Sequence, residues 1–378
     1  MRISTTSDKA QNPVTLFTKN ALGEARRAAS RGIPLFGGFN RKVMTRSGGN
    51  DATRSFFRRR ASRYFHVLFC LAAAAFAAVP DSQASELNLP PKAVEAIHLM
   101  YSGKPDEAIA LARQIESATP DHPLGYLIEA NVLYWKIYCK RMERKWNTYD
   151  AWSYTRPADS DDEAELTLAD KVTHLAEAKI AKSDSAEMEL YAGLGYASRA
   201  RVLSLRYVKI PVVHAGVEAR RHLLRSLELN PNMVDAYLGL GLYNYYVDTL
   251  SGLAKVLRFF MGIPGGDKHE GLRQLEVDSA RGEQTQVEAR YNMAKSLRNY
   301  DLDYKRADEA AEPLLTAYPQ NAVFLLLVAD LEQKLGNKAG AAAKYHAAET
   351  VPNEDAACAD HLRNLAREGL ASLNLKGE

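Results

Sequence analysis

The sequence predicts an all-α chain in which pairs of helices repeat and stack as an α-solenoid. From Pro91 onward, apolar residues recur at spacings of three and four, which is the period of an α-helix. Small, large, glycine and proline positions also recur about every 34 residues, as in stacked helix pairs. One helix pair cannot bury its own apolar face, so we expect several units to share a continuous core.

Composition places this core in the second part of the chain. With 378 residues, of which 46% are hydrophobic, the chain is long enough to bury a large core. The net charge of +3 is unevenly divided, because residues 1–84 hold 14 Lys and Arg against 4 Asp and Glu, which leaves 35 against 42 in residues 85–378. The acidic balance of the second part gives little support to a nucleic-acid partner, and none is expected.

Residues 1–84 have the pattern of a leader. Arg58 to Arg60 and Arg63 precede an apolar segment at 64–79, and small residues Ser82 and Ala84 follow it. The apolar segment is shorter than the roughly 20 residues of a membrane-spanning helix. We therefore predict a signal peptide cleaved after Ala84, followed by a single domain at 85–378.

The leader is unusually long, so the position of the true translation start is open. Secretory signals rarely carry an extension as long as residues 1–57, and a start at Met44 gives a more ordinary basic leader. An organellar transit peptide is the alternative, because the extension is rich in Arg and poor in acidic residues. Bulky Phe69 before Cys70 argues against lipidation. The preferred interpretation is export to the periplasm or cell envelope.

The repeat positions can be followed along the chain. The first unit has small, large, turn, small and terminating residues in the expected order, and later units repeat parts of this pattern. The residues are Ala96, Leu99, Gly103, Ala108 and Pro120; Tyr126, Ala130 and Leu133; Tyr191, Leu194, Gly195, Ala219, Leu223 and Pro231; Tyr237, Leu240 and Gly241; Tyr304, Ala307 and Pro319; and Leu325, Val328, Ala329, Gly336, Ala341, Tyr345 and Ala348.

These residues resemble the tetratricopeptide repeat (TPR) family over most of residues 91–352. The resemblance implies a right-handed α-solenoid of about six helix pairs, two of them expanded, with a C-terminal cap helix at 355–373 that faces solvent on one side. It also implies a concave groove for protein or peptide segments. Small residues let paired helices approach, so Gly195 and Gly241 should each face a neighbouring helix without room for a side chain.

The first insertion, near residues 140–162, continues a stripe of large side chains through Trp135, Tyr138, Trp146 and Trp152. Such a stripe at helical spacing is more often packing than a binding face, although Trp and Tyr also favour interfaces. Ser160 to Glu163 matches a capping box, which predicts a new helix from about Asp161 to Ala181.

The second insertion, at 249–266, is apolar on nearly all sides. It carries only two charges, Lys255 and Arg258, and is too short to span a bilayer. A buried bracing helix is the preferred interpretation. The alternative is a helix lying on a membrane surface through Val256 and Phe259, which gives a peripheral membrane protein.

The turn after this insertion, Gly265-Gly266-Asp267-Lys268, invites comparison with phosphate sites at helix N-termini. It lacks the full GxxxxGK[ST] pattern, so a structural turn is preferred. Together with the preceding apolar helix and the downstream Gly271-Leu272-x-x-Leu275, it is similar to the tetratricopeptide-39 and yeast inclusion-body-clearance outer-membrane family. That local resemblance covers about fifty residues.

The sequence gives little support to catalysis, and we expect a protein that is not an enzyme and has no cofactor or metal. His269-Glu270 lacks the second His of HExxH, and neither GxSxG nor CxxC occurs. An enzyme with a nonlocal site is the remaining alternative. After signal removal Cys139 and Cys358 remain at opposite ends of the array. An extended solenoid holds them too far apart to bond, so free thiols are expected.

The family's groove positions, carried onto this chain, predict a binding face rich in aromatic residues. They are Asn131, Tyr134, Tyr196, Arg199, Leu242, Tyr245, Tyr246 and Asp330. Ala93 and Ile97 stand where the carboxylate-binding members of the family place Lys and Asn, so that clamp is not expected. Arg199 is the predicted partner of an acidic or C-terminal group on the ligand, while packing of Tyr196, Tyr245 and Tyr246 within the superhelix is an equal alternative. The predicted function is therefore an exported scaffold or assembly factor that binds protein segments.

Overall fold

The computed structural model describes residues 86–143, 160–206 and 209–374. The chain divides into two units, Met1–Val79 and Pro80–Glu378. All described residues belong to the second unit. Every regular element among the described residues is helical, which confirms the predicted all-α class.

The predicted leader lies outside the described residues. Trp146 and Trp152 of the predicted aromatic stripe also lie outside the described residues.

The first six described helices follow the start and stop signals of the sequence. They are α3 (Pro91–Tyr101), α4 (Pro105–Ala118), α5 (Leu124–Arg141), α7 (Ser160–Ile180), α8 (Ala186–Leu205) and α9 (Lys209–Leu229). Proline begins α3 and α4, where its missing N–H costs nothing. The start of α7 at Ser160 confirms the helix predicted from the capping box.

The remaining helices include one short apolar helix and one π-helical turn. They are α10 (Ala236–Asp248), α11 (Gly252–Phe260), α12 (Lys268–Arg281), α13 (Gln286–Ser296), η1 (Leu297–Asp301), α14 (Tyr304–Ala317), α15 (Ala322–Lys334), α16 (Lys338–Thr350) and α17 (Ala356–Asn374). Asp303, Asn321 and Asn337 cap α14, α15 and α16 by accepting backbone N–H groups of the first turn.

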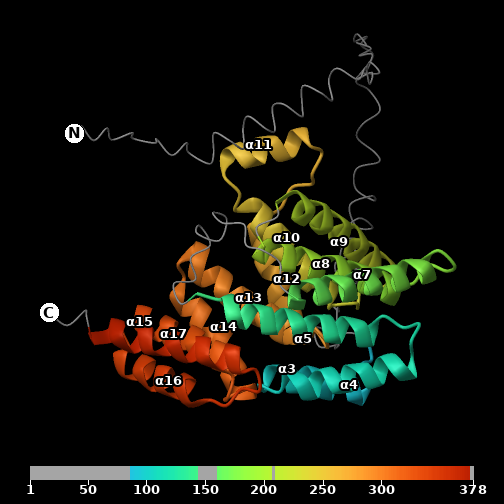
Figure 1. The fold of residues 1–378 in the computed structure, drawn as a ribbon. Coiled ribbons are helices and arrows are strands. Elements are labelled where there is room, and N and C mark those ends of the chain that lie inside the picture. Colours follow the sequence, from blue (N-terminus) through green and yellow to red (C-terminus); the bar gives the residue numbers. More distant parts are fainter. Residues whose placement is uncertain (1–85, 144–159, 207–208, 375–378) are drawn as a thin grey trace, which may run out of the picture. The chain divides into compact units, whose positions relative to one another are not determined.

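The described helices pack in the order of the chain. Leaving α11 aside, each helix packs on the next, and alternate helices also meet, because α5 contacts α3 and α8, and α10 contacts α8 and α13 (Figure 1). This arrangement of sequence-adjacent helix pairs with an inner row of alternate helices is consistent with a helical solenoid.

The two glycines expected to face a neighbouring helix lie at close helix crossings. A Cβ atom on Gly241 of α10 would lie 2.8 Å from Leu275 Cγ and 2.9 Å from the Gly271 carbonyl oxygen of α12. On Gly195 of α8 it would lie 2.9 Å from a side-chain carbon of Val172 in α7. Both positions therefore exclude a side chain, as predicted.

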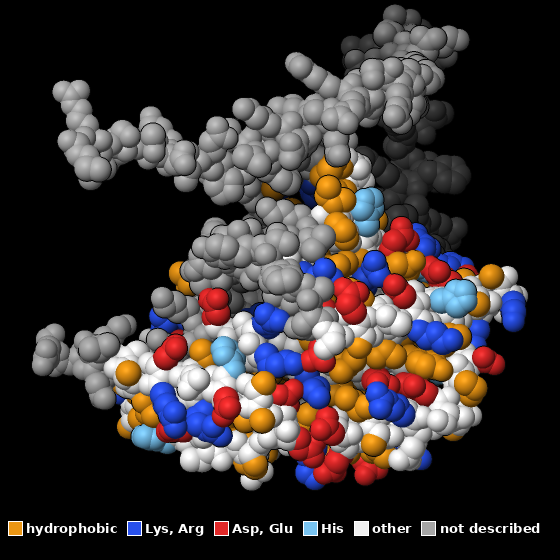
Figure 2. Space-filling view, in the orientation of Figure 1, with side chains coloured by type: hydrophobic (Ala, Val, Ile, Leu, Met, Phe, Trp, Pro, Cys, Tyr) orange, Lys and Arg blue, Asp and Glu red, His pale blue; other side chains and the backbone are white. Residues whose placement is uncertain are grey.

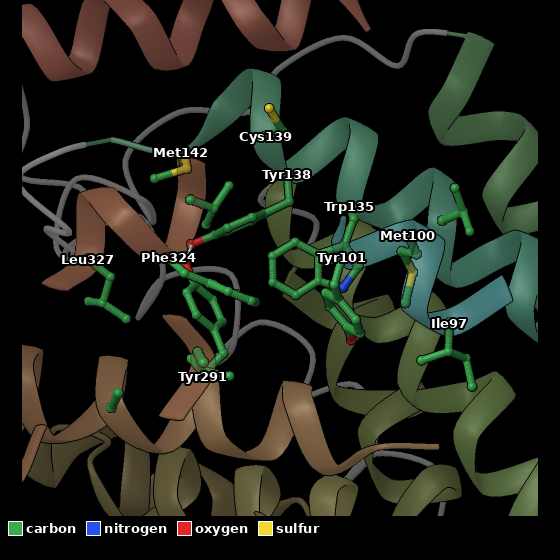
Figure 3. Close-up of a cluster of buried hydrophobic side chains, with 14 of the residues drawn as sticks. Ile97, Met100, Tyr101, Trp135, Tyr138, Cys139, Met142, Tyr291, Phe324 and Leu327 are labelled. Carbon is green, nitrogen blue, oxygen red and sulfur yellow. Dashed lines mark hydrogen bonds between the residues drawn. The ribbon is translucent and has the colours of Figure 1, made fainter. Parts of the chain in front are cut away.

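Aromatic side chains from helices far apart in the sequence fill the centre of the array (Figure 3). The Trp135 ring of α5 lies 5.4 Å from Tyr101 of α3 and 5.3 Å from Tyr291 of α13. Tyr291 in turn lies 5.7 Å from Phe324 of α15. All four rings are buried. The inner faces of these helices thus share one core, instead of lining an open groove along their whole length.

The two ends of the described array meet at a head-to-tail seam, where residues 101–142 contact residues 321–362. Helix α17 packs on α5. Asn321 donates its side-chain amide to the Tyr101 carbonyl oxygen at 2.8 Å. The Glu354 carboxylate accepts the Asp106 N–H of α4 at 3.1 Å. The C-terminal helix therefore packs onto the first units with one side, while Asn364, Arg367 and Glu368 on its other side stay exposed to solvent, as expected for the final helix.

A disulfide bond between Cys139 of α5 and Cys358 of α17 crosses the seam, with the two Cα atoms 5.5 Å apart. The prediction of free thiols is therefore wrong. It assumed an extended array, whereas the return of α17 to α5 brings the two cysteines within the span that a disulfide bond requires.

A strap at the start of the described chain holds α3 to later units. The Glu283 carboxylate, between α12 and α13, accepts the backbone N–H groups of Leu87 and Leu89 at 2.9 and 3.0 Å. The Glu86 carboxylate accepts the side-chain amides of Asn230 and Asn232, just before α10. The strap thus adds a second long-range link to the fold.

Candidate functional site

The inner faces of α5, α8 and α13 bring together a group of polar and aromatic side chains that we call the inner cluster. It consists of Asn131, Tyr134 and Tyr138 of α5, Arg201 of α8, and Glu288 and Lys295 of α13. Glu288 and Lys295 are seven residues apart, which is close to two helical turns, so both lie on one face of α13.

Arg201 links the three helices of the inner cluster. Its guanidinium donates to the Asn131 side-chain oxygen at 2.7 Å and forms an ion pair with Glu288. It also lies 4.3 Å from the centre of the Tyr134 ring. Glu288 is buried, so this charge pair is held in a medium where an unpaired charge costs much. The pair therefore fixes α8 against α13 and α5.

A second buried carboxylate lies behind Arg201. Glu165 of α7 is fully buried and accepts the hydroxyl of Ser198 in α8. Burial raises the pKa of Glu165 to about 7, and the Ser198 hydrogen bond and Arg201 only partly oppose this shift. Ser198 is also fully buried. The two side chains are therefore placed to position Arg201 and not to meet a substrate.

Lys295 has a different environment. Its ammonium lies 5.1 Å from the centre of the Tyr138 ring and 5.7 Å from that of Tyr291, and it forms no ion pair with a described residue. The Tyr138 and Tyr291 hydroxyls are joined by a 2.7 Å hydrogen bond. Tyr246 of α10 is near enough to act electrostatically on Tyr291 and Lys295. The cation is thus surrounded by tyrosines.

The structure divides the predicted groove residues between different surroundings. Asn131 and Tyr134 belong to the inner cluster. Tyr196 and Arg199, however, face away from it. Tyr196 donates to Glu177 of α7 and stacks on His222 of α9 at 5.6 Å, and Arg199 pairs with Asp170 of α7.

Other predicted groove residues are part of the core. Tyr245 is fully buried and donates its hydroxyl to the Ser296 carbonyl oxygen at 3.0 Å. Asp330 is buried and pairs with Arg298. Leu242 is partly buried against a small apolar cluster of α10, α12 and α13. Tyr246 remains partly exposed beside Tyr245 and Tyr300. For Tyr196 and Tyr245, the packing interpretation describes the structure.

Sequence reasoning missed Arg201, Glu288 and Lys295. Arg201 lies two residues beyond Arg199, and two residues rotate an α-helix by about 200°, so the predicted arginine points to the opposite face. Ser198, which is small and three residues before Arg201, marks the inner face of α8. That spacing was the local signal available in the sequence.

The glycine-rich turn before α12 does not offer free amides to an anion. The Asp267 side chain accepts the His269 and Glu270 N–H groups at the helix start. The Lys268 ammonium forms an ion pair with Asp301. The turn therefore caps and anchors α12, in line with the structural interpretation.

The apolar insertion forms an arm, residues 249–266, that stands apart from the packed layers (Figure 1). Its helix α11 is not among the described helices that pack extensively on one another. Val256, Phe259 and Met261 are 52%, 77% and 61% exposed. At its base, Asp248 binds Lys255 and the Lys268 N–H. The preferred expectation of a buried bracing helix therefore does not hold for Val256, Phe259 and Met261.

Three further features of the described residues bear on which kinds of functional site they can form. A cavity at the seam holds about 50 Å³, far less than the roughly 300 to 1,000 Å³ of small-molecule sites. The described residues contain no group of three or more His, Cys, Asp and Glu placed to hold a metal ion. On the face shown in Figure 2, acidic and basic side chains are interspersed.

Comparison with known proteins gives no assignment. No protein-family model matches the chain, and no curated protein matches it. Within the described residues, no helix has the length and apolar character needed to cross a membrane.

Proposed function

We propose that this protein is an exported, non-enzymatic scaffold or assembly factor of the cell envelope that binds protein segments. Its body is a right-handed solenoid of six TPR-like pairs, with α17 closing the array. The pairs are α3–α4, α5–α7, α8–α9, α10–α12, α13–α14 and α15–α16. The observation that carries the proposal is the contact of alternate helices, which creates an inner row behind an outer one.

The disulfide bond supports the export part of the proposal. Disulfide bonds persist in oxidising compartments outside the cytosol and are rare inside it. Cys139 and Cys358 are both buried and bonded across the seam. Together with the basic leader and its apolar segment, this pairing favours the periplasm or cell envelope. N-terminal sequencing of the mature protein should give Ser85 as the first residue, and an intact Met1 would contradict export.

Binding is proposed at the margin of the inner row, because its centre is filled. Tyr134, Tyr246 and Lys295 are partly exposed, whereas Trp135, Tyr291 and Phe324 are buried. Partly exposed tyrosines provide large contact areas and a hydroxyl at modest entropic cost. A partner segment thus lies along this margin and does not pass through the array.

Crosslinking in intact cells, followed by affinity capture and mass spectrometry, tests the proposed function. Wild type should capture specific envelope proteins, and Tyr246→Ala should capture less of them. Tyr126→Ala is the matched control, because Tyr126 is also partly exposed but lies near Lys171 of α7. Both variants should melt close to wild type. Capture that does not change in folded Tyr246→Ala would place the interaction elsewhere.

A membrane-peripheral role is the second candidate, and the exposure of the arm favours it. Val256, Phe259 and Met261 offer an apolar tip of the kind that inserts at a lipid surface. Flotation with anionic liposomes should carry the wild-type protein upward and lose the Phe259→Glu variant. Ile210→Glu is a control, because Ile210 is 62% exposed at the start of α9. No flotation of the cleaved wild type would argue against this role.

A further inference from the structure

Lys295 differs from the other cations that lie along the inner row. Arg201 pairs with Glu288, Arg298 with Asp330, and Lys268 with Asp301. Lys295 is on the same helix as Glu288, but that carboxylate is already engaged by Arg201. Among the described residues, the Lys295 ammonium lies against the rings of Tyr138 and Tyr291 and within hydrogen-bonding reach of the Tyr138 hydroxyl, and it has no carboxylate partner.

Aromatic faces compensate a cation only in part. The ring quadrupole attracts an ammonium, but it does not accept the strong hydrogen bonds that a carboxylate does. Burial opposes the charge of Lys295, but the surrounding tyrosines outweigh it and raise the pKa, so Lys295 keeps its charge while it is partly withdrawn from water. A cation in such a place still has hydrogen-bonding capacity for an anion. The two rings hold the ammonium in position and exclude water from one side of it.

The surroundings indicate which kind of anion fits. Lys295 is one point charge, whereas a phosphate group usually requires several donors or a helix N-terminus. Tyr134 is partly exposed and stacks on Tyr138 with ring centres 5.9 Å apart, and the Arg201 cation near its ring is already paired with Glu288, so an aromatic surface continues away from the ammonium. A carboxylate attached to a peptide with apolar neighbours matches both features.

We propose that Lys295, flanked by Tyr134 and Tyr138, is the recognition site for a carboxylate of the bound protein segment. The inference rests on the proposed scaffold function and specifies the chemistry of its partner. The carboxylate belongs either to a Glu or Asp side chain or to the C-terminus of the partner. Arg199, predicted for this role from the sequence, is excluded from it by its position against α7.

Three pools of short rhodamine-labelled peptides with the same randomised apolar and aromatic positions distinguish these sources. The first pool contains one Glu and an amidated C-terminus, the second has no acidic residue and a free C-terminus, and the third has neither. Fluorescence anisotropy with the purified full chain measures affinity. At least one acidic pool should bind about tenfold more tightly than the neutral pool, as expected for one charge-assisted hydrogen bond. The pool that binds identifies the source.

Substitutions at Lys295 connect this binding to the site. Lys295→Met, which keeps most of the stem, should lower the affinity for the acidic pool to that of the neutral pool. Lys295→Arg should retain most of the affinity. Lys334→Met is the matched control, because Lys334 also lies near a tyrosine ring, 5.9 Å from the centre of Tyr304, but is exposed at the end of α15. The affinity of this variant for the acidic pool should equal that of wild type.

The melting temperature of Lys295→Met provides an independent readout. Removing this cation leaves no carboxylate of the described residues without its partner, so the variant should melt at the same or a higher temperature. A clear fall would show that Lys295 holds the fold and would overturn the proposal. Equal binding of all three pools, binding of none, or unchanged binding in Lys295→Met would also overturn it.

Capture from intact cells separates failure of this proposal from failure of the proposed function. If wild type and Lys295→Met capture the same proteins equally, the carboxylate site is wrong and the scaffold function stands. If wild type captures no specific protein, the scaffold function itself fails. If Lys295→Met reduces capture and Lys334→Met does not, the result supports both the carboxylate site and the scaffold function.

Discussion

The seam and the arm both depart from a simple repeat of helix pairs, but they are attached to the rest of the described array in opposite ways. At the seam, distant parts of the chain are joined by a disulfide bond, buried side chains and backbone hydrogen bonds. The arm is joined to its neighbours by polar contacts at its base and leaves large apolar side chains exposed.

This difference indicates which residues should determine the stability of the fold and which are free to serve binding. The disulfide bond restricts the unfolded chain, and the other contacts of the seam join residues far apart in sequence, so the seam contributes to the stability of the whole array. An exposed segment with few such contacts contributes little to folding, so its sequence is free to serve binding. Changes at the seam should therefore affect melting, and changes at the tip of the arm should affect binding.

The largest effect is expected from removing the disulfide bond. Cys139 and Cys358 are separated by 219 positions, so the bond closes a very long loop. Loss of such a bond typically costs about 2 to 5 kcal/mol. The double variant Cys139→Ser, Cys358→Ser should melt well below oxidised wild type in circular dichroism, and reduced wild type should match it. Equal melting of the oxidised and reduced forms would show that the seam needs no crosslink.

The next effect lies at the base of the arm, where α10 crosses α12. Gly241→Leu places a side chain against Leu275 and the Gly271 carbonyl oxygen. Overpacking of this kind costs about 1 to 3 kcal/mol, against a gain below about 1 kcal/mol from removing a helical glycine. The variant should melt lower than wild type. A raised melting temperature would mean that the two helices separate easily.

A smaller effect with a defined pH dependence is expected at Asp278 of α12. Burial, and then the charge of Asp235, raise the pKa of Asp278 well above its ordinary value. The folded state therefore binds this proton more tightly than the unfolded state does. The contribution of Asp278 to stability is fully present below its unfolded-state pKa and is lost as the pH rises to the folded-state pKa.

The variant Asp278→Asn removes this decline, because an amide does not ionise and still accepts the Thr285 hydroxyl. It should melt above wild type at neutral pH, and the difference should shrink on acidification. Thermal melts across a pH series measure this. Asp121→Asn, at an exposed site, is the control. A difference that grows at low pH would contradict the linkage.

The smallest effect on folding is expected at the tip of the arm. Val256→Ser and Met261→Ser alter side chains that are 52% and 61% exposed. Surface changes of this kind usually stay within about 0.5 kcal/mol. Urea denaturation of the two variants should overlay wild type. A marked loss of stability in either would show that the arm braces the body and would remove the contrast with the seam.

The helices were predictable from sequence because their signals are local. Periodicity, the capping box at Ser160 and the small residues at Gly195 and Gly241 act within one or two turns. The seam depends instead on small rotations between successive units, which add up along the array, and no short segment contains that sum. The error at Cys139 and Cys358 follows from this.

The inner cluster was only partly predictable for a related reason. Asn131 and Tyr134 were found because groove positions can be counted along α5. Arg201 was missed because its neighbour Arg199 offers the same chemistry on the opposite face of α8. Lys295 becomes conspicuous only when the carboxylates of other helices are known to be engaged elsewhere.

The seam also limits how this chain can change in length. An open repeat array gains or loses whole units at little cost to those that remain, because each unit touches only its neighbours. Here an added helix pair would carry Cys358 away from Cys139 and Asn321 away from Tyr101. Insertions within a unit, such as the arm between α10 and α12, leave both contacts in register. The number of units is therefore the conserved quantity that we expect among descendants of this architecture, while the arm is free to lengthen, shorten or disappear.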